Sequence, residues 1–94
     1  MTRPLIVWGG ATYIRDMGQR RVLVAAPTKK RAVELMNECF RFGGSLYDLN
    51  KYWSKTGNDV ELSVATEEGV WLNTDERRGL SRENYVRMEP RKEG

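Results

Sequence analysis

The stretch RRVLVAAPTKKRAVELM, residues 20–36, decides the fold, because a strand gives way to a helix within it. Its first half is rich in β-branched and small apolar residues and predicts a strand. Pro27 ends this strand, and Thr28 is a suitable N-cap for the helix that follows, residues 28–42. Apolar residues recur in that helix at spacings of three and four, which places them on one face: Ala32, Leu35, Met36, Cys39 and Phe40.

On the N-terminal side, PLIVWGGATYIR, residues 4–15, predicts another strand. The turn residues 16–19 would join it to residues 20–26 in a β-hairpin. The pair Gly9-Gly10 interrupts this strand and indicates a bulge or a bend. The pair is not a phosphate-binding loop, because the chain has neither the GxxxxGK(S/T) nor the GxGxxG spacing.

On the C-terminal side, Ser45 is a suitable N-cap for a second helix that ends at Gly57. The buried seam of this helix consists of Leu46, Leu49 and Trp53. Residues 59–66 suit either a short helix or a strand, so both alternatives stay open.

Two further strands are predicted near the C-terminus, VWLN at residues 70–73 and YVRM at residues 85–88. The first would join the N-terminal β-hairpin, and the second would lie at an edge. The expected fold class is α+β: a small, mostly antiparallel sheet with two to three helices on one face. The 94 residues suffice for one domain, residues 1–88, followed by a flexible tail at residues 89–94.

The apolar runs of the chain are short. The longest, residues 5–8 and 22–26, fall far below the roughly 20 residues that a membrane-spanning helix needs. The N-terminus also lacks the apolar core of a signal peptide. We therefore expect a cytoplasmic protein with no membrane partner.

The chain contains no histidine and a single cysteine, Cys39. Without histidine it lacks the usual general base, every catalytic triad that uses histidine, and nearly all zinc sites. Cys39 lies on the apolar face of the first helix, where a core position explains it better than a reactive thiol. We expect a protein that is not an enzyme, with no catalytic residue, no metal and no cofactor.

Charge is distributed unevenly along the chain. Residues 1–31 carry a net charge of +6 and the remaining residues −3, which gives +3 for the whole chain. A basic segment suggests an anionic partner, although it would also keep a small protein soluble. Lys29, Lys30 and Arg31 begin the first helix, where free backbone N–H groups and three cations would form an anion- or phosphate-binding site. The alternative is an exposed first turn that tolerates these cations.

The stretch YDLNKYWSKTGN, residues 47–58, carries aromatic and basic side chains beside the predicted seam. Tyr47, Lys51 and Tyr52 lie off that seam, and Trp71 faces away from the apolar residues on either side of it in its strand. Exposed aromatic residues flanked by cations are typical of protein interfaces, so these four residues form a candidate partner-binding site. The alternative is that their side chains are partly buried.

The two helices also have features of a helix-turn-helix, in which these residues would face DNA bases: Tyr47, Asn50, Lys51 and Ser54. The segment MNECFRFGG, residues 36–44, separates the two apolar seams. A helix-turn-helix joins its helices by about three or four residues. The longer connection disfavours this arrangement, which stays an alternative.

Three segments, RRVLVAAPTKKRAVELM, SLYDLNKYWSKTGN and EEGVWL, resemble in their order and spacing a group of small uncharacterised bacteriophage proteins. The resemblance covers residues 20–73: a β-hairpin, a Ser/Thr-Lys-rich helix start, a second helix with a YWS-x-TGN-like end, and a Gly-Val strand. It implies a binding protein that inhibits a host or anti-phage defence complex, for example a CRISPR effector, by occlusion. A DNA- or RNA-binding regulator and a protein that sequesters a nucleotide are the alternatives.

Overall fold

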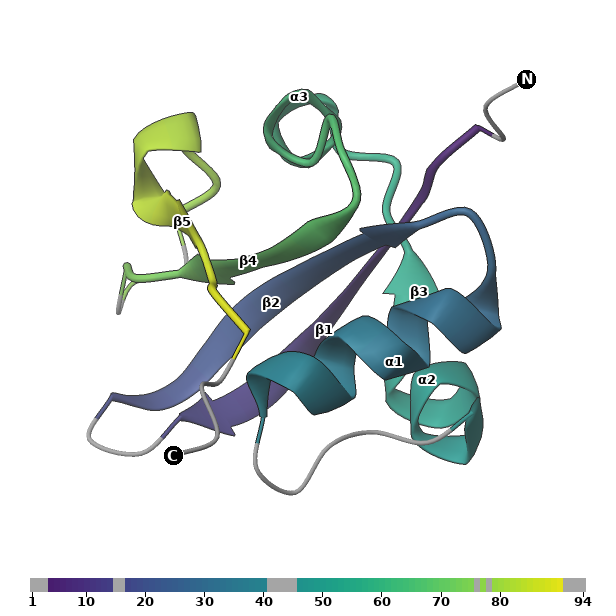
Figure 1. The fold of residues 1–94 in the computed structure, drawn as a ribbon. Helices are drawn as coiled ribbons and strands as arrows, with labels where there is room; N and C mark the ends of the chain where they lie inside the picture. The colour runs from purple at the N-terminus through teal and green to yellow at the C-terminus, as the bar shows by residue number, and fades with distance from the viewer. Residues whose placement is uncertain (1–3, 15–16, 41–45, 76, 78, 91–94) are drawn as a thin grey trace.

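The computed structural model describes residues 4–14, 17–40, 46–75, 77 and 79–90, and for residues 46–48 the backbone alone. The described chain forms a five-stranded sheet with the order β3-β1-β2-β4-β5, in which all neighbours are antiparallel (Figure 1). The predicted α+β fold is confirmed. The elements in chain order are β1 (Ile6–Ile14), β2 (Gly18–Ala26), α1 (Lys29–Cys39), α2 (Leu46–Tyr52), β3 (Trp53–Lys55), α3 (Asp59–Val64), β4 (Gly69–Asn73), the 3-10 helix η1 (Arg82–Asn84) and β5 (Tyr85–Arg87).

The predicted N-terminal hairpin and the helix after it are confirmed, although α1 ends at Cys39, because Phe40 is extended, and not at residue 42 as expected. Strands β1 and β2 pair without interruption from Ile6↔Ala26 to Ile14↔Gly18. Gly18 has a φ of +80°, a left-handed conformation that favours glycine after the turn. Thr28 caps α1 as expected, because its Oγ1 accepts a hydrogen bond of 3.2 Å from the backbone N–H of Arg31.

The sheet is covered on both faces, so the expectation of helices on one face is wrong. Helices α1 and α2 lie on one side of the sheet and α3 lies on the other (Figure 1). All residues from Val22 to Ala26 are buried, because successive side chains of β2 face opposite layers that are both filled. The core on the α1–α2 side contains Trp8, Val22, Val24, Leu35, Met36, Leu49 and Val70. The core on the α3 side contains Val7, Leu23, Ala25, Ala65, Trp71 and Tyr85.

The glycine pair at positions 9 and 10 does not form the expected bulge, because both residues keep the regular register of β1. Their function is to leave room for large side chains. A Cβ atom on Gly10 would lie 2.6 Å from Cδ2 of Trp53, and one on Gly9 would lie 2.8 Å from Cζ of Arg21. The two glycines therefore admit the indole on one face and the guanidinium on the other.

The second helix ends at Tyr52, so its predicted extension to Gly57 is wrong. The next three residues form β3, which pairs with β1 through Gly10↔Trp53, Gly9↔Ser54 and Trp8↔Lys55. Asn58 then caps α3 by accepting a hydrogen bond of 3.1 Å from the backbone N–H of Glu61. The open choice for residues 59–66 is thereby resolved as a helix. The expected cap at Ser45 lies outside the described residues.

The two predicted C-terminal strands are confirmed as β4, which pairs with β2, and β5, which lies at the edge. The expected tail begins with Glu89 and Pro90, which line a hollow of the surface. Residues 91–94 lie outside the described chain. No helix in the described ranges is long and apolar enough to cross a membrane.

Candidate protein-binding face

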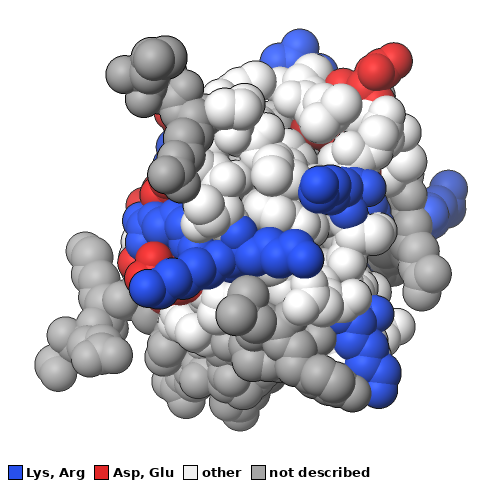
Figure 2. Space-filling view, turned by 90° about the vertical axis from the view of Figure 1, so that its right-hand side faces the viewer, with Lys and Arg blue, Asp and Glu red and all other residues white. Residues whose placement is uncertain are grey.

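Four exposed lysines lie in three elements: the edge strand β3 and the helices α2 and α1 on one side of the sheet. Two of them begin α1, one lies in the last turn of α2, and one ends β3: Lys29, Lys30, Lys51 and Lys55. Figure 2 shows Lys and Arg side chains across the middle of this side of the molecule, with acidic side chains toward its left and upper margins. We refer to these four residues as the lysine face.

Two features hold the lysine face together although its members are distant in sequence. The Nζ atom of Lys29 donates a hydrogen bond of 2.7 Å to Oδ1 of Asn50, which connects the start of α1 to α2. Trp53 is buried at the start of β3, whereas its neighbours Tyr52 and Ser54 are exposed. The indole therefore anchors this segment to the core and leaves the residues around it available to a partner.

Tyr52 is the aromatic residue of this surface. Its side chain is 59% exposed, and Nζ of Lys51 lies 5.2 Å from the ring centroid, within the range of a cation–π interaction. The predicted exposure of Tyr52 and Lys51 is confirmed, while their contact with a partner stays a prediction. The side chain of Tyr47, the third predicted residue of this stretch, lies outside the described part of the structure.

Trp71 does not belong to an exposed site, so its expected surface position is wrong. Only 6% of the residue is exposed, and its ring packs in the core on the α3 side of the sheet. The guanidinium carbon of Arg87 lies 5.5 Å from the ring centroid and covers it further. The side chain does face away from Val70, as predicted, but the second helical layer fills the space that it enters.

Arg31 does not join Lys29 and Lys30 in an anion site. Its guanidinium forms a hydrogen bond of 2.7 Å with Glu68 and lies 3.6 and 3.5 Å from the carboxylates of Glu34 and Glu38. The hydrogen bond with Glu68 raises the pKa of Arg31, against an opposing effect of burial. Its charge is therefore compensated within the chain. The predicted set of three free cations at the start of α1 is reduced to two exposed lysines.

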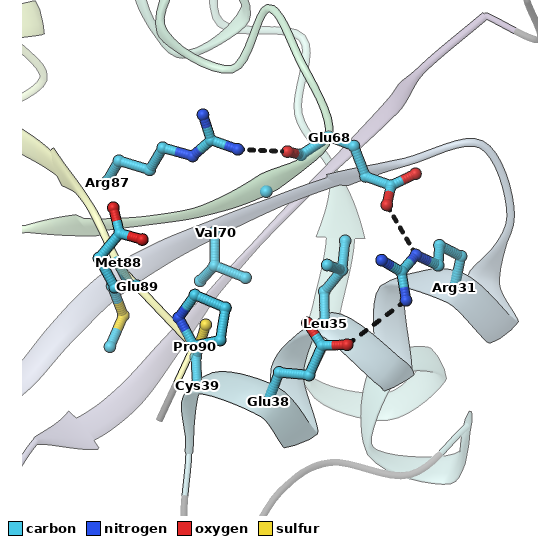
Figure 3. Close-up of a pocket in the computed structure, with 11 residues that line it drawn as sticks. Arg31, Leu35, Glu38, Cys39, Glu68, Val70, Arg87, Met88, Glu89 and Pro90 are labelled. Carbon is cyan, nitrogen blue, oxygen red and sulfur yellow. Dashed lines mark hydrogen bonds and ion pairs between the residues drawn. The ribbon is translucent and has the colours of Figure 1, made fainter. Parts of the chain in front are cut away.

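A hollow of about 250 Å³ lies between α1 and the strands β4 and β5 (Figure 3). Its lining includes these apolar or weakly polar side chains: Leu35, Cys39, Val70 and Met88. Arg31 lies on one rim, and Arg87 on the other rim donates hydrogen bonds to a carboxylate oxygen of Glu67 and to the carbonyl of Glu68. Because both guanidinium groups are paired within the chain, the described lining of the hollow has no free cation to offer an anionic ligand.

On the α3 side, a buried carboxylate binds three side chains, two of them from distant strands and one from the loop before α3. Glu61, in α3, is 1% exposed and forms a two-point ion pair with Arg21 of β2. Its oxygens also accept hydrogen bonds of 2.5 Å from the hydroxyl groups of Thr56 and Tyr85. We refer to Arg21, Thr56, Glu61 and Tyr85 as the Glu61 network.

The Glu61 network shifts the titration of its members. Burial raises the pKa of Glu61, but the hydrogen bonds that it accepts outweigh burial, so its pKa lies below 4.5. Burial, together with the hydrogen bond to Glu61, raises the pKa of Tyr85 from 10.0 to about 12. The hydrogen bond with Glu61 also raises the pKa of Arg21.

The geometry of this network favours a structural function. Each oxygen of Glu61 already accepts two hydrogen bonds, one from Arg21 and one from a hydroxyl group. A general base needs a free acceptor site that can reach a substrate proton, and the carboxylate retains none. Glu61 therefore connects α3 to β2 and β5. Sequence patterns did not identify Glu61 as a buried residue. Glu61 precedes Val64 by three residues and Ala65 by four, and this spacing places them on one face only if the segment is helical.

The helix-turn-helix alternative loses two of its residues. Asn50 accepts the hydrogen bond from Lys29, and Ser54 belongs to β3 and not to a helix. Within the described ranges, no group of three or more His, Cys, Asp or Glu side chains could hold a metal ion. Comparison with known proteins finds no matching family model, no matching curated protein and no matching solved structure.

Proposed function

We propose that the protein is a small phage-encoded binding protein, without enzymatic activity, that acts in the host cytoplasm. Its lysine face covers an acidic surface of a host or anti-phage defence protein complex and inhibits that complex by occlusion. The observation that carries this proposal is that four exposed lysines and an exposed tyrosine belong to β3, α2 and the start of α1, which the Lys29–Asn50 hydrogen bond connects to α2. Tyrosine is enriched at protein interfaces, and a positively charged surface complements an acidic partner.

The free charges support an intermolecular function for this face. Lys30 and Lys55 form no hydrogen bond or ion pair with any part of the chain that the structure describes. Lys29 binds a neutral amide, and no carboxylate in the described part of the chain compensates its charge. By contrast, Arg31 and Arg21 have carboxylate partners. The positive sign of the face suits an acidic surface and is opposite to the sign that an imitation of nucleic acid would need.

A nucleic-acid partner is the second candidate. Tyr52 and Lys51 lie side by side and exposed, which is an arrangement that can stack a base and neutralise a phosphate. Nucleotide sequestration has less support, because Arg31 is engaged with three carboxylates. The test below distinguishes the first two candidates.

The test compares the wild-type protein with two charge-reversal variants in capture from a host lysate. Lys30→Glu with Lys55→Glu changes two free charges of the lysine face. The matched control, Arg77→Glu with Arg82→Glu, changes two exposed arginines in and beside η1, away from β3. We expect the first variant to lose a discrete protein complex that the wild type and the control both retain.

The captured complex is then purified and assayed with each protein. The proposal requires that the wild type and the control inhibit its activity, that the lysine variant does not, and that added salt weakens binding. Retention of the complex by the lysine variant would disprove the proposal. Retention of duplex or single-stranded nucleic acid in place of a protein, with a steep salt dependence, would establish the second candidate.

A further inference from the structure

The outer side of β3, the strand that ends with Lys55 of the lysine face, carries main-chain groups that no strand of the described chain pairs. The backbone N–H of Thr56 donates a hydrogen bond of 2.9 Å to the carbonyl of Val7, in line with the β1–β3 register. Since successive residues of a strand direct their N–H and C=O groups to opposite sides, Ser54 and Thr56 face β1. Lys55 consequently directs its N–H and C=O groups away from the sheet.

These outward groups are free to bind a partner. Lys55 lies opposite Trp8 in a non-hydrogen-bonded pair, no hydrogen bond to the rest of the described chain is found for it, and it is exposed. Gly57 lies two residues after Lys55 and continues the same alternation. It is also exposed, and a Cβ atom on it would meet nothing within 4 Å. No described strand pairs with β3 on this side. The edge at Lys55 and Gly57 is thus open to an added strand.

We propose that an extended acidic segment of the partner protein adds to β3 as a sixth strand of the sheet. This inference rests on the proposed function, because it specifies how the lysine face holds its acidic partner. A residue of the added strand directly opposite Lys55 exchanges two main-chain hydrogen bonds with it. Its side chain lies on the same face of the sheet as the side chain of Lys55.

Because the lysines lie on one side of the sheet, the positions of acidic residues in the partner segment can be predicted. In β3 the side chain of Lys55 lies on the same face as that of Trp53, which packs in the core on the α1–α2 side. Lys29, Lys30 and Lys51 belong to the helices of that side. Acidic residues at every second position of the added strand therefore meet lysines, whereas the intervening positions face away from them.

Main-chain pairing also favours a polypeptide over a nucleic acid. Alternating N–H and C=O groups at the spacing of a strand match another polypeptide backbone. A DNA backbone carries phosphate acceptors and no donor for the carbonyl of Lys55, and an RNA backbone offers only its 2′-hydroxyl groups. The lysine charges would attract either class of partner, so the main-chain edge is the feature that distinguishes them.

The experiment uses the full chain and peptides of about ten residues in which Glu and Thr alternate. In one isomer the Glu nitrogens are methylated, and in the matched isomer the Thr nitrogens are methylated. The two isomers have the same mass and charge. In the proposed pairing the Glu N–H groups point to β3, so we expect the Glu-methylated isomer to bind at least about tenfold more weakly.

Two variants test the same contact from the side of the protein. Lys55→Ala removes the charge alone, whereas Lys55→Pro removes the charge and the outward N–H without affecting a bond to β1. We expect the Pro variant to bind the Thr-methylated peptide more weakly than the Ala variant does, provided that both unfold at similar urea concentrations. Exchange of the Lys55 amide hydrogen in the wild type should slow by at least about tenfold when this peptide is bound.

Equal affinity of the two peptide isomers would overturn the proposal of an added strand. The proposed function of the lysine face would still hold if Lys30→Glu with Lys55→Glu abolished capture of the partner complex. Capture that survives this charge reversal would instead disprove the proposed function. A thymidine oligonucleotide that binds more tightly than either peptide, and equally to the Ala and Pro variants, would assign the face to nucleic acid and overturn the inference.

Discussion

The two sides of the sheet carry their charges in different surroundings. Under α3, the carboxylate of Glu61 is removed from water and binds Arg21 and two hydroxyl groups. On the side of α1 and α2 the core is apolar, and the charges are lysines exposed at its rim. The first group has used its bonding capacity within the chain. In the second group, Lys30 and Lys55 have no side-chain partner in the described chain and retain their capacity for another molecule.

This difference separates stability from binding. A buried charge that loses its partner keeps its full desolvation cost, so substitution in the Glu61 network should affect folding strongly. An exposed lysine is hydrated with or without a partner, so its substitution should hardly affect folding. The predictions below test this separation, beginning with the largest expected effect.

Substitution of Arg21 should have the largest effect. Arg21→Met leaves the carboxylate of Glu61 buried without its counter-charge, and we expect the free energy of unfolding to fall by about 3–5 kcal/mol. Urea denaturation followed by circular dichroism measures this loss. The matched control, Arg21→Met with Glu61→Met, removes both charges and should lose less than the single substitution. A single variant within about 1 kcal/mol of the wild type would show that the pair is not structural.

Substitution of Gly10 tests the apolar side of the sheet. The Cβ atom of Gly10→Ala would lie 2.6 Å from the indole of Trp53, so the ring or the strand must shift. We expect a loss of about 1–3 kcal/mol in the free energy of unfolding, as for other overpacked cores. Gly57→Ala is the matched control, because its new Cβ would meet nothing within 4 Å. Equal stability of the two variants would contradict the packing function of Gly10.

These two sites also show which parts of the fold the sequence predicts. The hairpin, α1 and β4 are predictable because each has a local signal: turn residues, an apolar spacing of three and four, or a short β-branched run. β3 has no such signal. Trp53 lies four residues after Leu49 and fits a helical seam, so only pairing with the distant strand β1 identifies it as a strand. The positions of Gly9 and Gly10 are likewise explained only by side chains far along the chain.

The candidate site divides in the same way. The exposure of Lys29, Lys30, Lys51 and Tyr52 is predictable, because they lie off the apolar stripes of their elements. Trp71 is misjudged because alternation within a strand identifies the opposite face but not whether that face is covered. The unbroken apolar run at residues 22–26 is the signal for two covered faces. The Glu61 network depends on Arg21, 40 positions away, and no local pattern contains that distance.

The pH dependence of stability should show the effect of the Glu61 network on the titration of Tyr85. The pKa of Tyr85 is about 12 in the folded chain, against 10.0 ordinarily, so the folded state holds this proton where the unfolded state has lost it. The associated stability is present below pH 10 and is lost as the pH rises from 10.0 to about 12. This one group should add a slope of up to about 1.4 kcal/mol per pH unit.

The control for this measurement is Tyr85→Phe, in which the additional alkaline slope should be absent although other groups still titrate. Urea denaturation of both proteins at several pH values above neutrality provides the comparison. If the two proteins lose stability in parallel between pH 10 and 12, the hydroxyl of Tyr85 does not hold its proton through Glu61.

The smallest expected effect on folding belongs to the lysine face, and its sign is the opposite of the others. Lys30 lies in the first turn of α1, where a positive charge opposes the helix dipole, and it has no partner in the described chain. Lys30→Glu should therefore raise the free energy of unfolding by about 0.3–1 kcal/mol, and Lys30→Gln by less.

The Lys30→Glu substitution should also weaken binding of the acidic peptide, because a carboxylate replaces a cation of the lysine face. Urea denaturation and peptide titration of both variants measure the two effects, and high salt should diminish each of them. A gain in stability together with a loss of binding is what distinguishes a residue kept for a partner from one kept for the fold. A loss in both would place Lys30 with Arg21 among the structural charges.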